Sequence, residues 1–83
     1  MMTDHELNYL HDLVVLLLER GRTAAVRNRR ATPDSGGDPF ERGRAQGYYE
    51  ALTTMRSQLI AFGVEPASVG LGEDVDLEAE LLG

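Results

Sequence analysis

The sequence predicts an all-α protein: a long antiparallel helical hairpin with a short C-terminal helical appendage, dimerising into a four-helix bundle. Two long segments repeat apolar residues at steps of three and four, the spacing of one face of an α-helix. A Pro- and Gly-rich stretch at residues 32–38 separates them. The six consecutive apolar residues 13–18 surround the helix axis, so one partner helix cannot bury them all.

The first helix is expected over residues 4–31. Thr3 and Glu6 have the spacing of a capping box, in which each side chain accepts a hydrogen bond from the other residue's backbone N–H. The apolar register continues through Gly21 without interruption. In the alternative, Gly21 ends one helix and Thr23 begins the next. An interior glycine costs about 1 kcal/mol, but we favour the continuous helix because the apolar register is unbroken.

A flexible connector over residues 32–38 leads to a second helix expected over residues 39–62. Asp38 suits the N-cap and Pro39 the first helical position, and Gly63 suits the stop. The apolar stripe of this helix again advances by threes and fours: Phe40, Gly43, Gly47, Tyr48, Ala51, Leu52, Met55, Leu59 and Phe62.

The hairpin is expected to match side chains by size when paired residue numbers sum to about 70. Small residues then meet near the connector, with Ala24 and Ala25 opposite Ala45 and Gly47. Gly21 lies opposite Tyr49, and large residues meet at the open end. Gly43, Gly47 and Ala51, at four-residue spacing, are predicted to let the two backbones approach closely near the connector.

The appendage, residues 64–83, is predicted to form short helical turns, one opening at Pro66 and one capped by Asp74 or Asp76 and running through Leu82. Its apolar residues are too numerous for a purely solvated tail. Two alternatives remain open for this segment: it docks on its own hairpin, or it docks on a second copy.

Length and composition favour a single domain, residues 1–83, in the bacterial cytoplasm. A chain of 83 residues buries a modest core, so association is a natural supplement. The absence of cysteine excludes disulfides and thiolate metal sites, and neither a signal peptide nor a membrane span is predicted. All eight cationic residues are arginine, which we attribute to a GC-rich coding background.

Charge is strongly segregated along the chain. Residues 1–19 hold four acids and no arginine, residues 20–44 hold seven arginines and three acids, and residues 45–83 hold one arginine and seven acids. The middle segment therefore forms a basic hairpin tip that could attract an acidic protein or nucleic acid. Its arginines are Arg20, Arg22, Arg27, Arg29, Arg30, Arg42 and Arg44.

No constellation of residues predicts an enzyme, a cofactor, a metal site or a small-molecule substrate. His5 and His11 lie seven residues apart, about 10 Å along a helix, which is too far for one metal ion. No nucleophile or phosphate-binding loop accompanies them.

The segment Gly43–Leu52, with residues 61–64 and 69–71, resembles the second half of small, uncharacterised bacterial helical proteins. This resemblance implies a helical fold and no particular activity or site.

Surplus apolar helix surface predicts a non-enzymatic protein–protein interaction module, such as a small regulator, adaptor, immunity-type or assembly protein. A homodimer and a further protein partner are expected. Two alternatives stay open: a nucleic-acid-binding regulator using the arginine tip, and a minor subunit of a larger complex. The candidate dimer or partner interface comprises Leu13, Val15, Leu16, Tyr49 and Ile60.

Overall fold

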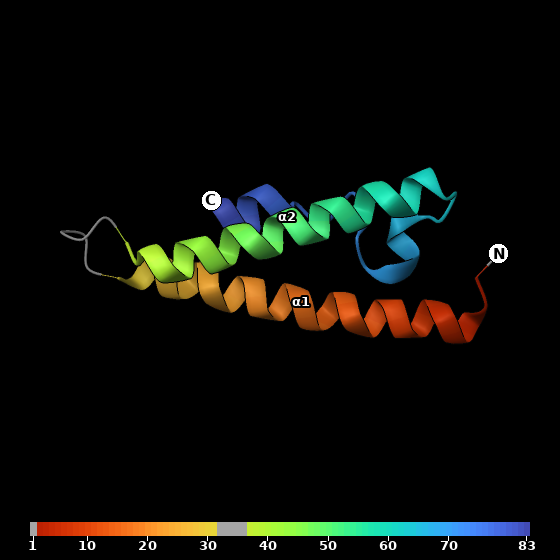
Figure 1. The fold of residues 1–83 in the computed structure, drawn as a ribbon, viewed down its shortest axis with the longest axis horizontal. Helices are drawn as coiled ribbons and strands as arrows, with labels where there is room; N and C mark the ends of the chain where they lie inside the picture. The colour runs from red at the N-terminus through yellow and green to blue at the C-terminus, as the bar shows by residue number, and fades with distance from the viewer. Residues whose placement is uncertain (1, 32–36) are drawn as a thin grey trace.

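The computed structural model describes residues 2–31 and 37–83, and these residues form helices and their connections without a strand. Two long helices, α1 (Asp4–Arg30) and α2 (Pro39–Ala61), run antiparallel side by side (Figure 1). The C-terminal segment then doubles back along them, so the molecule is a rod of 50 × 19 × 18 Å. The predicted helical hairpin is thereby confirmed.

Helix α1 begins at the predicted capping box. The Thr3 hydroxyl accepts a hydrogen bond from the Glu6 backbone N–H at 3.1 Å, and the Thr3 backbone N–H donates to Glu6 Oε1 at 3.0 Å. The second of these bonds stabilises the ionised carboxylate and holds the pKa of Glu6 below its ordinary value. The helix continues through Gly21 to Arg30, so the alternative break at Gly21 does not occur.

Helix α2 has the predicted cap at each end. Asp38 Oδ1 accepts hydrogen bonds from the backbone N–H groups of Phe40 and Glu41. At the other end the Val64 N–H donates to the Leu59 carbonyl at 2.8 Å, and Gly63 has a φ of +76°, as a Schellman stop requires. The helix ends at Ala61, one residue before the predicted bound. Most of the predicted connector, residues 32–36, lies outside the described residues.

The core has two parts, one of small and one of large side chains, as the predicted pairing of the helices indicated. Ala24, Ala25 and Ala45 pack together near the connector. Large residues fill the remainder, and half of them come from the C-terminal segment: Val14, Leu18, Leu52, Leu59, Val69, Leu71, Leu77 and Leu81. The appendage therefore docks on its own hairpin.

The C-terminal segment contains two short helical turns, η2 (Pro66–Val69) and η3 (Glu78–Leu82). The Asp76 carboxylate accepts a hydrogen bond from the Ala79 N–H at 3.0 Å, which identifies Asp76 as the residue that caps the last turn. At the η3 end, a Cβ added to Gly21 would lie 2.9 Å from Leu81 Cδ2 and 3.1 Å from Tyr48 Cβ. Gly21 thus allows α1, α2 and η3 to converge.

Three details of the predicted packing are wrong. Gly21 meets Tyr48, one residue before the predicted Tyr49. A Cβ at Gly43 or Gly47 would meet nothing within 4 Å, and Ala51 is exposed, so these three residues do not bring the helix backbones together. Phe40 and Phe62 are 71% and 80% exposed. The reason is that the apolar stripe of α2 is wider than one contact face, and Ala45 and Leu52 occupy the buried part of it.

Candidate protein-interaction surface

The C-terminal segment covers one side of the hairpin. On α1 this side includes Val14, since a Cβ at Gly70 would lie 3.8 Å from Val14 Cγ1. On α2 it includes Arg56, whose guanidinium donates to the carbonyls of Leu71 and Val75 at 3.1 and 2.8 Å. These contacts define which positions of each helix face the C-terminal segment and which face away.

Helix α1 carries apolar residues on the side that faces away. Leu16 follows Val14 by two residues, which places it about 200° around the helix. Tyr9 precedes Leu16 by seven residues and shares its face, and Leu13 lies about 60° from Leu16. Tyr9 and Leu16 are 67% and 50% exposed. This stripe has the three- and four-residue spacing that suits packing against another helix.

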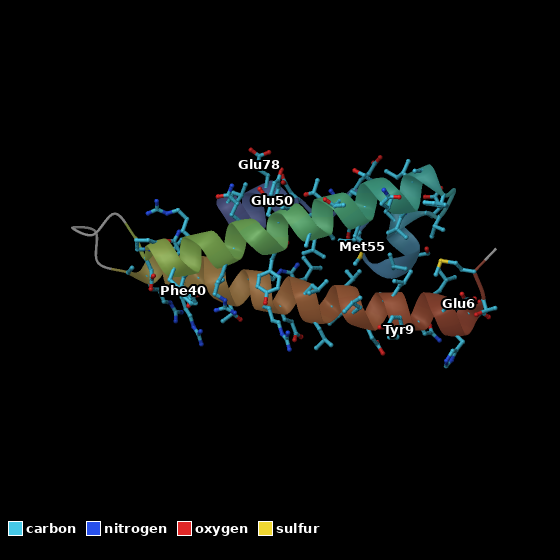
Figure 2. All side chains as sticks on the ribbon, viewed as in Figure 1. Glu6, Tyr9, Phe40, Glu50, Met55 and Glu78 are labelled. Atoms are coloured by element: carbon cyan, nitrogen blue, oxygen red, sulfur yellow. The ribbon has the colours of Figure 1, made fainter. Side chains whose placement is uncertain are left out.

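Helix α2 adds a second stripe on the same side of the hairpin. Ile60 lines a pocket beside the C-terminal segment. Ala51 precedes Ile60 by nine residues, so the Ala51 side chain points about 180° away from that of Ile60. Phe40 and Phe62 lie eleven residues before and after Ala51, within about 20° of its direction. Figure 2 shows Tyr9 and Phe40 toward opposite ends of the molecule.

The α1 and α2 stripes lie on the same side of the hairpin, and the C-terminal segment does not cover this side. We call this side the open face and define it by six residues: Tyr9, Leu13, Leu16, Phe40, Ala51 and Phe62. An uncovered apolar side of a helical hairpin is typical of a surface that binds another protein.

The structure separates the five residues predicted as an interface. Leu13 and Leu16 lie on the open face, and Val15 lies about 100° from Leu16 on the flank of α1. Tyr49 packs against the core, and Ile60 lines the pocket beside the C-terminal segment. The five residues therefore do not form one continuous surface.

Sequence reasoning missed Phe40 and Phe62 as surface residues because their spacing also fits the core stripe. It missed Tyr9 because this residue falls outside that stripe. The signal that could have identified all three is the width of the apolar stripes, which exceeds what one partner helix covers.

The arginines of the predicted basic tip are partly neutralised within the chain. Arg22 binds Glu80 through two hydrogen bonds of 3.0 and 3.1 Å. Arg44 binds the buried carboxylate of Glu41 at 3.0 Å, and Arg27 lies 3.8 Å from the same group. Among the described residues, Arg20 and Arg30 make no ion pair. The tip is therefore less basic than its sequence indicates.

No group of three or more histidines and carboxylates in residues 2–31 and 37–83 is placed to hold a metal ion. Comparison with known proteins found no matching family model, curated protein or solved structure. None of the described helices is long and apolar enough to cross a membrane.

Proposed function

We propose that this chain is a non-enzymatic protein-interaction module that works as a homodimer, with the open faces of two hairpins packed against each other. The observation that carries the proposal is the exposure of Tyr9, Leu16, Phe40 and Phe62 on a single side of the hairpin. Pairing two such sides gives a four-helix bundle with the apolar stripes inside.

Charge on the open face favours an antiparallel dimer. Arg27 lies toward the connector end of α1, on the same face as Leu16, whereas Asp12 lies toward the other end. A two-fold axis that reverses the long direction brings the basic end of one hairpin over the acidic end of its partner. The opposite arrangement would bring like charges together.

The sequence of α2 fits the same arrangement. Because Phe40 and Phe62 are equally distant from Ala51, reversal about Ala51 places Phe40 of one hairpin against Phe62 of its partner. The small side chain of Ala51 then allows close approach at the centre. The partial neutralisation of the arginine tip favours this proposal over nucleic-acid binding, because paired guanidinium groups displace fewer counterions from phosphates.

Oxidative crosslinking tests the proposed pairing. The chain has no cysteine, so the variant Ala51→Cys carries a single thiol. In the antiparallel dimer this thiol faces its own copy across the two-fold axis, and mild oxidation should convert most of the protein to a covalent dimer. The variant Glu50→Cys is the matched control, because its exposed side chain points about 100° away. Equal crosslinking of the two variants, or none at position 51, would contradict this pairing.

A further inference from the structure

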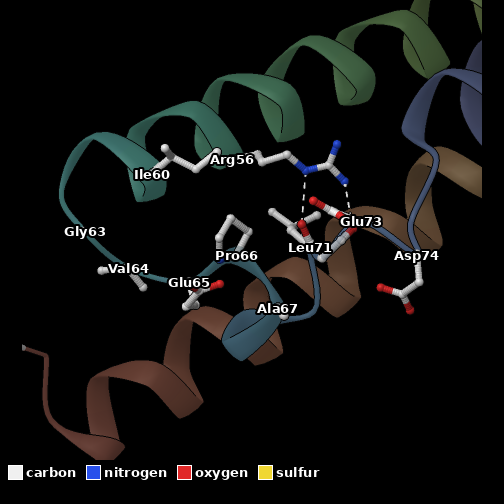
Figure 3. A pocket seen from close by; sticks show the side chains of 11 residues that line it. Arg56, Ile60, Gly63, Val64, Glu65, Pro66, Ala67, Leu71, Glu73 and Asp74 are labelled. Carbon is white, nitrogen blue, oxygen red and sulfur yellow. Dashed lines mark hydrogen bonds between the residues drawn. The ribbon is translucent and has the colours of Figure 1, made fainter.

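A pocket of about 710 Å³ lies on the opposite side of the molecule from the open face, between the end of α2 and the C-terminal segment (Figure 3). Its apolar wall includes Ile60, Val64 and Pro66, and Ile60 is 62% exposed. An aliphatic side chain held at the mouth of a pocket is available to contact an incoming apolar group.

Arg56 keeps this pocket open. Its guanidinium lies between α2 and the loop of residues 70–76, where it donates to the backbone carbonyls of Leu71 and Gly72 at 3.1 and 3.5 Å (Figure 3). It also donates to the Val75 carbonyl at 2.8 Å. These bonds keep the loop and α2 apart by about the length of one arginine side chain. The site is therefore formed before any ligand arrives, which lowers the entropic cost of binding.

The rim of the pocket is acidic. Three exposed acidic residues line it: Glu65, Glu73 and Asp74. Their carboxylates make no ion pair with any described residue. The donor groups of Arg56 point at the loop carbonyls, so this arginine does not neutralise the rim by direct pairing. The surrounding segment, residues 45–83, has seven acids and one arginine and thus attracts cationic ligands.

We propose that this pocket binds a peptide segment of a partner protein, in which an apolar side chain enters the cavity and neighbouring arginine or lysine residues meet the acidic rim. The apolar wall stabilises the inserted side chain by removing it from water, and the carboxylates select the flanking charge. Free metal ions fit poorly, because no three carboxylates or histidines of the described residues converge. This inference goes beyond the proposed homodimer and uses a separate surface.

A model peptide tests the inference with the full chain. The probe is a capped peptide with a central leucine between two arginines on each side, titrated into isotope-labelled protein and followed by NMR. We expect amide shifts at Ile60, Val64 and Gly72, with an affinity on the order of 0.1–1 mM. Affinity should fall as salt is raised, because the flanking contacts are exposed ion pairs.

Three variants and two control peptides make the test decisive. Ile60→Ser, and separately Glu73→Gln combined with Asp74→Asn, should each weaken binding at least about tenfold. Phe62→Ser, which alters an exposed apolar side chain outside the pocket, should leave peptide affinity unchanged. The proposal is wrong if glycine can replace the leucine, or if glutamates can replace the arginines, without loss of affinity.

The same variants separate this inference from the proposed dimer. Ile60→Ser should leave the solution mass unchanged, because Ile60 points about 180° away from Ala51 on the open face. A dimer that does not bind the peptide would contradict only the pocket proposal. A monomer that still binds the peptide would contradict only the dimer proposal.

Discussion

Replacing Leu71 with alanine should lower the free energy of unfolding by about 2–5 kcal/mol. Leu71 is fully buried, and its side chain belongs to the core shared by the hairpin and the C-terminal segment. Truncation removes buried methyl groups and leaves a cavity, because α1 and α2 are held apart by the remaining core residues. Urea denaturation followed by circular dichroism at one fixed protein concentration measures this loss, since association also contributes to stability.

Leu82→Ala is the control for this prediction. Leu82 lies in the same segment but is 45% exposed, so its truncation should cost less than about 1 kcal/mol. Equal effects of the two substitutions, both below about 1 kcal/mol, would mean that the C-terminal segment is not docked in solution.

Arg56→Met should lower the free energy of unfolding by about 2–4 kcal/mol, because it removes charge-assisted hydrogen bonds worth about 1.5–3 kcal/mol each. The carbonyls of Leu71 and Val75 would lose their guanidinium donor, while methionine keeps most of the aliphatic volume. Amide hydrogen exchange should show the largest loss of protection in the C-terminal segment, which Arg56 fastens to α2.

The matched control is Arg30→Met at the end of α1. Arg30 is exposed and makes no ion pair among the described residues, so the same substitution should change stability by less than about 0.5 kcal/mol. An Arg56→Met variant as stable as the Arg30→Met variant would contradict the role given to Arg56.

The two long helices were predictable because their signals are local. The Thr3–Glu6 box, the Asp38 cap and the Gly63 stop each depend on residues within a few positions in the sequence, and all three occur as predicted. The continuity of α1 through Gly21 followed from an unbroken apolar register. Each of these features depends on the sequence of one helix and its ends, so it could be predicted without knowledge of the tertiary fold.

Positions that depend on a third element were harder to predict. The apolar residues of the C-terminal segment indicated docking, but nothing local said that Leu71 and Leu81 would fill the core of the same chain. Because these residues cover one side of the hairpin, the remaining apolar residues of α1 and α2 lie on the open face, where Phe40 and Phe62 are exposed. Arg56 has no sequence signature either, because its partners are backbone carbonyls 15 to 19 residues away.

Sedimentation equilibrium over a wide concentration range tests the central proposal, pairing through the open face. The chain has a mass of 9.1 kDa, so the proposed dimer predicts a species of twice that mass that dissociates on dilution. Leu16→Glu places a charge within the α1 stripe and should weaken association at least about 100-fold, or about 2.7 kcal/mol. A native chain that stays at 9.1 kDa at every concentration, or a Leu16→Glu variant that dimerises as tightly as the native chain, would contradict the proposal.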